Sequence, residues 1–245
     1  MKKLLILGGI LTMFTMLFAC GGKNENVLVV STSANFPPYE YKEGNKIVGI
    51  DADIADQIAK KLGKEIKWMD MEFDSVLASI VSGKSDMALA GLTVTEERKK
   101  NVDFSNTYAT SVQKVIVKRD GNVNSIEDLS NNKLIGVQSG TTGDIYATDD
   151  FGDDSVLRYS KFVDAVQALK VGKLDAVICD EQVAIKLVEE AGGNDLALLS
   201  TPYAEEEYAI AITKGNTELL NSINEIIDKM KSDGTLDNIV GKYIN

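Results

Sequence analysis

The 245-residue sequence contains no histidine and only two cysteines, Cys20 and Cys179. The absence of histidine excludes the usual histidine-based catalytic triads and Cys/His zinc sites. Proline is scarce, with 3 residues, and a composition of 44% hydrophobic and 26% charged residues is that of a globular protein. The formal net charge of −11 excludes a nucleic-acid binder, which needs the opposite sign. We expect neither a metal site nor a cofactor.

The N-terminus has the features of a secretion signal. Two lysines are followed by an apolar run of 16 residues, Leu4 to Ala19, and then by Cys20. This run is shorter than the roughly 20 residues needed to span a bilayer, and no basic stop-transfer cluster follows it. Residues 1–19 therefore predict a cleavable signal peptide, with a membrane anchor helix as the alternative.

The segment from Leu17 to Cys20 resembles the lipobox of bacterial lipoproteins, in which a small residue precedes a cysteine that is acylated after cleavage. The resemblance implies that Cys20 carries the lipid, such as palmitate, and that residues 20–26 tether the domain to the outer face of the cytoplasmic membrane. Cys179 then has no cysteine to pair with inside the domain. An intramolecular disulfide is excluded, so core burial must supply the stability.

Strands and helices alternate along the first hundred residues. Apolar residues spaced by three and four predict the helices, each followed by a glycine, and short apolar β-branched runs predict the strands. The expected elements are a strand at 27–31, a helix at 51–62 ended by Gly63, a strand at 65–69, a helix at 75–82 capped by Asp74, and a strand at 87–90. This order predicts an α/β fold with mainly parallel sheets covered by helices, in one large domain or two of about 100 residues.

A weak internal repeat relates residues 76–91 to residues 165–180, at an offset of 89. Both segments read as a helix, a Gly-Lys pair, an aspartate and a strand, although any two αβ units share some of this likeness. Ligands of open parallel sheets bind beyond the carboxyl ends of the strands. The two strand ends, 90–93 and 179–180, are therefore expected to face each other across a cleft if each belongs to its own lobe.

The first strand end leads to Thr93, Thr95 and Arg98. Thr95 is expected to cap a short helix that holds Arg98 one turn in. The guanidinium of Arg98 can grip a carboxylate with two parallel hydrogen bonds, and the Thr93 hydroxyl can add a donor. The alternative is that Arg98 belongs to a solvated charged stretch.

The second lobe offers a glycine-flanked turn, residues 136–144, that contains Thr141 and Thr142 and leads into a helix. Its amides and helix dipole suit an anion, although the spacing of a phosphate loop is absent and a plain strand-to-helix turn is the alternative. Asp180 can accept hydrogen bonds from an ammonium group or, alternatively, cap a helix. Arg98, Thr93 and the turn at 136–144 supply hydrogen-bond donors, and Asp180 supplies acceptors. Together they fit the carboxylate and the ammonium of an α-amino acid.

Three aromatic residues and two prolines lie between Ser33 and Tyr41, directly after the first strand. The prolines stiffen this loop, so that Phe36 can hold its ring over a ligand at low entropic cost. Phe73 is expected to supply a second wall. Burial in the core is the alternative role for Tyr39 and Tyr41.

These residues resemble the amino-acid-binding solute-binding proteins of ABC importers, and the resemblance covers nearly the whole mature chain. It is carried by segments in a characteristic order and spacing, namely Phe36 to Tyr41, Val48 to Asp51, Ala90 to Thr93, Arg98 to Ser105, Gly136 to Thr142, and Asp175 to Asp180. The family implies the type II periplasmic-binding-protein fold, with two α/β lobes joined by two hinge strands. Lobe 1 would hold residues 27–108 and 208–245, lobe 2 residues 113–203, and the hinge residues 108–112 and 204–208.

The resemblance also implies roles for individual residues. Arg98 and Thr93 would grip the ligand carboxylate with help from Thr141 and Thr142. Asp180 and the Gly91 carbonyl would take the ammonium. The full implied ligand site is Ser33, Phe36, Phe73, Ala90, Gly91, Thr93, Arg98, Gln138, Thr141, Thr142 and Asp180.

Departures from the family bear on the choice of ligand. Ser33 stands where several binders of cationic amino acids have aspartate, while Gln138 and Cys179 stand where the glutamine binder has lysine and histidine. No extra basic residue joins Arg98 in the matched segments, which disfavours a dicarboxylic ligand. A polar or cationic amino acid is expected, and Glu40, Asp70 or the run 205–207 could meet a positive side chain. A run of glutamates is, however, typical of a solvated surface.

The sequence predicts an extracytoplasmic, lipid-anchored, monomeric protein. Its predicted function is to capture a free amino acid and deliver it to an ABC transporter permease. It is not expected to be an enzyme. The alternatives are a cyclohexadienyl-dehydratase-like enzyme on the same fold and a ligand-sensing or adhesive surface lipoprotein.

Overall fold

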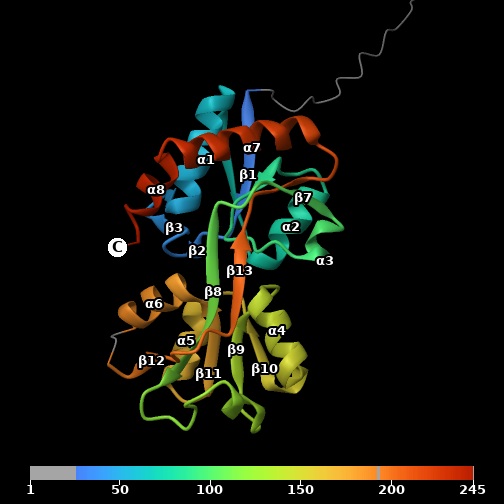
Figure 1. Ribbon diagram of the computed structural model, residues 1–245. Coiled ribbons are helices and arrows are strands. Elements are labelled where there is room, and N and C mark those ends of the chain that lie inside the picture. The colour runs from blue at the N-terminus through green and yellow to red at the C-terminus, as the bar shows by residue number, and fades with distance from the viewer. Residues whose placement is uncertain (1–25, 192–193, 245) are drawn as a thin grey trace, which may run out of the picture.

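The computed structural model describes residues 26–191 and 194–244, so the predicted signal peptide and Cys20 lie outside the described residues. The chain forms two α/β lobes, one above the other in Figure 1, connected by two long strands. No helix in the described part of the chain is long and apolar enough to cross a membrane.

The first lobe is built on a five-stranded sheet with the order β5-β1-β6-β14-β7. Strand β1 pairs in parallel with β5 and β6, whereas β14 is antiparallel to β6 and β7. The strands are β1 (Val27–Thr32), β5 (Glu65–Asp70), β6 (Met87–Ala88), β7 (Val102–Phe104) and β14 (Ala211–Thr213), and a small antiparallel sheet adds β2 (Asn35–Phe36), β3 (Glu40–Glu43) and β4 (Lys46–Val48).

Helices cover both faces of this sheet because β1 buries residues on both sides. Leu28 and Val30 pack in one apolar cluster with α1, α7 and α8, and α2 covers the opposite face. The helices of the lobe are α1 (Ile50–Leu62), α2 (Phe73–Val81), α3 (Glu96–Lys99), α7 (Thr217–Ser232) and α8 (Thr235–Val240).

The second lobe has the sheet order β10-β9-β11-β8-β12, with β13 also paired to β8. Strands β9, β10 and β11 are parallel, and β8 is antiparallel to its neighbours. The elements are β8 (Ala109–Lys118), β9 (Ile135–Gln138), α4 (Thr142–Phe151), β10 (Val156–Tyr159), α5 (Phe162–Lys170), β11 (Ala176–Asp180), α6 (Glu181–Glu190), β12 (Leu196–Leu198) and β13 (Ala204–Tyr208), with 3₁₀ turns at Glu127–Ser130 and Asp153–Ser155.

The predicted two-lobed α/β fold is confirmed, with one refinement of the sheets. In both lobes the strands that alternate with helices are parallel, as expected for crossover connections. The strands that enter or return between the lobes, β8, β13 and β14, add antiparallel pairs. Both sheets are therefore mixed rather than mainly parallel.

Strands β8 and β13 are the two connections between the lobes (Figure 1), and all of β13 pairs with the first half of β8, residues 109–113. In this antiparallel ladder Ala204 lies opposite Gln113 and Tyr208 lies opposite Ala109. The lobes also touch directly, since the rings of Phe36 and Phe162 lie 6.0 Å apart. The described arrangement is thus a closed one, with side chains of both lobes in contact.

Local signals placed most helix ends correctly. Helix α1 ends at Gly63, which has the left-handed φ of 66° and donates to the carbonyl of Lys60. The two halves of the repeat form the same unit, α2 with β6 and α5 with β11, one in each lobe. Gly83 and Gly172 close the two helices with φ of 68° and 77°. The repeat thus reflects a shared local structure.

Asp74 is not the cap of the second helix. Helix α2 begins at Phe73, with Glu72 at the N-cap position and no side-chain capping bond, and Asp74 lies inside the first turn. The guanidinium of Arg98 sits 5.6 Å from the centre of the Phe73 ring, a tertiary contact that favours the earlier start. The strand expected at 87–90 is also shorter in the structure, where β6 ends at Ala88.

Candidate functional site

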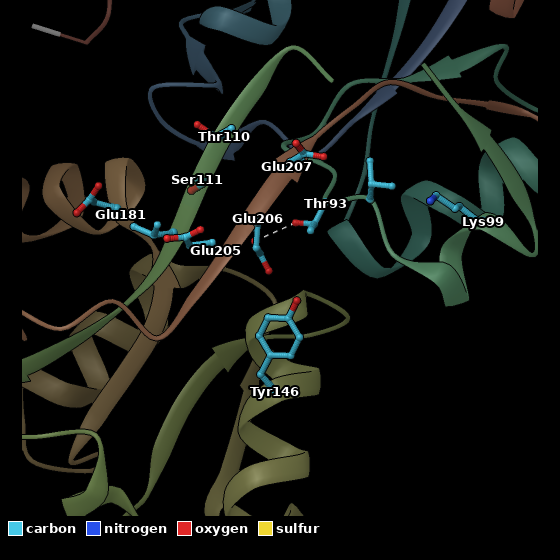
Figure 2. Close-up of a pocket in the computed structure, with 11 residues that line it drawn as sticks. Thr93, Lys99, Thr110, Ser111, Tyr146, Glu181, Glu205, Glu206 and Glu207 are labelled. Carbon is cyan, nitrogen blue, oxygen red and sulfur yellow. Dashed lines mark hydrogen bonds between the residues drawn. The ribbon is translucent and has the colours of Figure 1, made fainter. Parts of the chain in front are cut away.

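A cavity of about 780 Å³ opens between the lobes beside the connecting strands. Its wall comes from lobe 1, from β8 and β13, and from lobe 2, as Figure 2 shows. The lining residues are Thr93, Val94, Lys99, Thr110, Ser111, Val112, Tyr146, Glu181, Glu205, Glu206 and Glu207. Of the ligand residues implied by the family resemblance, Thr93 is in this lining, and several others lie directly behind it.

Arg98 is buried rather than solvated, with 7% of its surface exposed. The hydroxyl of Thr95 accepts the Arg98 amide, which confirms the predicted cap. The guanidinium donates from Nη1 to the Thr93 carbonyl at 2.8 Å and from Nη2 to the Gly140 carbonyl of the other lobe at 3.2 Å. Burial lowers the pKa of Arg98, and nearby acidic groups oppose this shift. Arg98 thus presents a fixed positive charge at the junction of the lobes.

Asp180 lies at the end of β11 and is 4% exposed. It occupies the N-cap position of α6, yet its side chain caps no helix amide. Its Oδ1 instead accepts hydrogen bonds from Tyr208 and, at 3.4 Å, from Ser111. Burial raises the pKa of Asp180, and the neighbouring Glu206 carboxylate raises it further. The carboxylate is therefore held by hydroxyl donors and has no cationic partner among the described residues.

Glu206 is the inward-facing member of the glutamate run on β13. Glu205 and Glu207 are exposed, whereas Glu206 is 6% exposed and points between Thr93 and Tyr146 (Figure 2). Its Oε2 accepts hydrogen bonds of 3.0 Å from the Thr93 hydroxyl and from Nε2 of Gln113. The expectation of a solvated run is wrong at this residue, because strand pairing with β8 alternates the side chains between two faces.

Ala90 and Gly91 form the tight turn after β6. The amide of Gly91 donates to Oδ2 of Asp51 at 3.0 Å, and Tyr108 donates to the same oxygen at 2.9 Å. Gly91 has a φ of 53°, and a Cβ there would lie 2.6 Å from the Phe36 ring. Only glycine fits this close approach without displacing the ring. Both Ala90 and Gly91 are buried.

The polar residues on the two rims meet across the lobes. Ser33 accepts a hydrogen bond from the Asn35 side chain, and Gln138 donates to Oδ1 of the same Asn35 at 3.2 Å. Thr141 caps α4 by accepting the amide of Asp144 and donates its own proton to the Gln138 carbonyl. Thr142 is buried in the first turn of α4.

The two phenylalanines implied as ligand walls have different neighbours. Phe36 packs against Tyr39 at 5.9 Å and Phe162 at 6.0 Å between ring centres, and Phe73 lies under Arg98. The ring contacts of the described residues include none between Phe36 and Phe73, and neither residue lines the cavity. A ligand sandwich between them stays a prediction.

The other acidic candidates lie away from the cavity lining. Glu40 is completely buried, and burial together with the neighbouring Asp51 raises its pKa well above the ordinary value. Asp70 accepts the Ala34 amide and pairs with Lys42. Within residues 26–191 and 194–244, no group of three or more Cys, Asp or Glu side chains is placed to hold a metal ion.

Sequence reasoning missed several side chains that surround the acidic residues. They come from the connecting strands and from α4, and they are Ser111, Gln113, Tyr146 and Tyr208; the run 205–207 was named, but Glu206 was not singled out within it. The available signal was the alternation of Glu206 and Tyr208 on one face of a short strand. This alternation identifies site residues only when the strand is known to run past the cavity.

We expect that Glu206→Gln lowers the pKa of Asp180, because it removes the negative charge that helps to raise it. The measurement is a carboxyl NMR titration of protein labelled with ¹³C at aspartate. Glu65→Gln is the matched control, since Glu65 is exposed at the start of β5 and does not line the cavity. An Asp180 pKa that is equal in wild type and Glu206→Gln would show that the two carboxylates do not interact.

The chain has two α/β lobes joined by paired strands. The cavity between them has a buried cation on one side and buried carboxylates on the other. These features define a two-lobed binding protein of the type II periplasmic class. Residues 28–245 match the bacterial extracellular solute-binding proteins, family 3. The chain belongs to this family.

Individual relatives agree with this assignment. The arginine-binding extracellular protein ArtP of Bacillus subtilis is 34% identical over 99% of this chain and 98% of its own length. The glutamine-binding protein GlnH of an ABC transporter of the same organism is 32% identical over 100% and 98%. A solved structure of an ancestral arginine-binding protein bound to arginine superposes with a TM-score of 0.85 at 40% identity, covering 90% of this chain and 99% of that one.

Proposed function

We propose that this protein captures a free α-amino acid between its lobes and delivers it to the permease of an ABC importer. The observation that carries the proposal is the split of complementary charges, with Arg98 in lobe 1 and Asp180 at the end of β11 in lobe 2. An α-amino acid carries a carboxylate and an ammonium on one carbon, so both charged residues can bind it only when the lobes are together.

The implied roles of the individual residues belong to this proposal. Arg98 binds the ligand carboxylate, Asp180 and the Gly91 carbonyl bind the ammonium, and Phe36 and Phe73 flank the side chain. Ser33, Ala90, Thr93, Gln138, Thr141 and Thr142 complete the site. The resemblance assigns Thr93 to the ligand carboxylate together with Arg98, but its hydroxyl donates to Glu206 here, so Arg98 remains the principal donor to the carboxylate in this proposal. A polar or cationic ligand is consistent with relatives named for arginine and glutamine.

Closure of the lobes is the proposed signal to the permease. Residues 108–112 and 204–208 act as the hinge, lobe 1 comprises residues 27–108 and 208–245, and lobe 2 comprises residues 113–203. Ligand favours closure because its full set of contacts exists only in the closed state. Turning a 1:99 population into 99:1 takes about 5.5 kcal/mol of differential affinity, which several charge-assisted hydrogen bonds can provide. We assign binding and not catalysis to this monomer.

A thermal-shift panel of the twenty amino acids, followed by small-angle scattering, tests the function. A ligand that binds only the folded state raises the melting temperature in proportion to RT ln(1 + [L]/Kd). The best ligand of the panel is then expected to reduce the radius of gyration of a ligand-free, open population. If no amino acid shifts the melting temperature, the protein does not have this function.

We also propose that Cys20 carries lipid and anchors the protein to the outer face of the cytoplasmic membrane. Two or more acyl chains anchor a protein stably, whereas one binds only marginally. Cys20→Ser is expected to leave the precursor uncleaved at this site and without lipid. Mass spectrometry of the N-terminal peptide measures both, with Cys179→Ser as control. A native N-terminus elsewhere, without lipid, would contradict the anchor.

A further inference from the structure

Glu206 lines the cavity, and one of its carboxylate oxygens is buried without a hydrogen bond from the described part of the chain. Its Oε2 accepts hydrogen bonds from Thr93 and Gln113, whereas Oε1 is buried and makes no hydrogen bond of standard geometry among the described residues. The Tyr146 hydroxyl is a neighbour of this carboxylate, and burial together with the Glu206 carboxylate raises the pKa of that tyrosine. An unsatisfied buried acceptor costs on the order of 1 to 3 kcal/mol, and more when charged. A donor that enters the cavity would relieve this cost.

The buried charges beside the cavity do not cancel. Arg98 contributes one positive charge, and Asp180 and Glu206 contribute two carboxylates, with all three side chains less than 10% exposed. Within the described ranges no ion pair joins Arg98 to either carboxylate, since its guanidinium donates to the carbonyls of Thr93 and Gly140. Burial and the Glu206 carboxylate raise the pKa of Asp180 to about 7, and whenever Asp180 is ionised the site is one positive charge short of neutrality.

The nearby lysines do not supply this charge. Lys114 donates to the Ser200 carbonyl and lies 3.6 Å from Glu181, and Lys99 pairs with Glu96 at 2.8 Å. The exposed carboxylates of the rim, Glu205 and Glu207 among them, add negative potential at the entrance. Such a field attracts cations and raises their local concentration.

We infer that Glu206 binds the side-chain cation of the ligand through Oε1 and thereby selects amino acids of net charge +1, those with a guanidinium or ammonium side chain. This inference rests on the proposed function, in which Arg98 and Asp180 hold the two groups of the α-carbon. A ligand with a neutral side chain satisfies those two residues but leaves one buried negative charge uncompensated. A cationic ligand neutralises the site and completes the hydrogen bonds of Glu206.

Calorimetric titration with L-arginine and its neutral analogue L-citrulline tests the inference. Wild-type protein is expected to bind arginine at least about tenfold more tightly than citrulline, the size of one charge-assisted contact. In Glu206→Gln this preference should fall to less than about threefold, mainly through weaker arginine binding. The glutamine side chain keeps an acceptor for Thr93, so the pocket remains built.

Glu65→Gln is the matched control and should keep the wild-type preference, because Glu65 is exposed at the start of β5 and does not line the cavity. Glu206→Asp, which keeps the charge, is expected to retain a preference for arginine if Glu206→Gln fails to fold. An arginine-to-citrulline ratio that stays unchanged in a folded Glu206→Gln protein overturns the inference, as does equal weakening of both ligands.

The inference and the proposed function can fail separately. If wild-type protein binds a neutral amino acid more tightly than arginine, and Arg98→Ala still abolishes that binding, the function stands and the role of Glu206 is wrong. If none of the twenty amino acids binds, both are wrong.

Discussion

Arg98→Ala is expected to weaken amino-acid binding by at least about 100-fold, because it removes the two charge-assisted hydrogen bonds proposed for the ligand carboxylate. Each such bond contributes roughly 1.5 to 3 kcal/mol, and the sum of two corresponds to a factor of that size. Arg98→Lys should lose nearly as much, since lysine cannot reproduce the paired donors of a guanidinium. Calorimetry with the best ligand of the thermal-shift panel gives the affinities.

A control is needed because Arg98 also links the lobes through the Gly140 carbonyl. Lys60→Ala, an exposed change on α1, should leave both affinity and melting temperature unaltered. Circular dichroism must show that Arg98→Ala is folded. Wild-type affinity in that folded variant would remove Arg98 from the site.

Gly49→Ala is expected to destabilise the fold by at least about 3 kcal/mol. Gly49 has a φ of 123°, a conformation that alanine rarely adopts. A Cβ there would lie 2.2 Å from the Tyr39 carbonyl oxygen and 2.8 Å from that of Pro38. These are backbone atoms that accept the amides of Asp51 and Ile50 at the start of α1, so they cannot move aside without breaking those bonds.

For a chain of this size the loss corresponds to a decrease in melting temperature of roughly 10 °C. Gly44→Ala is the comparison, since Gly44 has a φ of 60° but no atom within 4 Å of an added Cβ. That variant should lose only about 1 kcal/mol, the cost of the left-handed backbone. Similar melting temperatures for the two variants would show that the contacts at Gly49 are not restrictive.

Features that depend on neighbours in the chain were predictable from the residues themselves. The periodic apolar residues of α1, its end at Gly63 and the Thr95 cap all follow from interactions within a few residues. The same holds for the repeated helix-glycine-strand unit, which appears once in each lobe. That the two lobes face each other across hinge strands was predicted from the resemblance to a family, because local patterns carry no information on how lobes are arranged.

Other features depend on residues that are far apart in the sequence. Helix α2 starts at Phe73 rather than at an Asp74 cap, and Phe73 contacts Arg98, 25 positions later. The antiparallel pairs that mix the sheets join distant residues, 91 to 99 positions apart for β13 with β8 and 123 to 125 for β14 with β6. Long-range packing competes with local preference at such points, and it wins when it buries more surface.

Glu206 illustrates the boundary between the two. Three successive glutamates have the same chemistry, and their sequence gives equal reason to expect each of them in solvent. Pairing of β13 with β8 turns the middle one inward, next to Thr93 and Gln113, which lie 113 and 93 positions away. The pattern of residues was sufficient to predict the two lobes, the short helices, and Arg98 and Asp180 after the two repeated strands. Which of the three carboxylates is buried beside the cavity was decided by strand register, because a shift of one residue in a strand reverses every side chain.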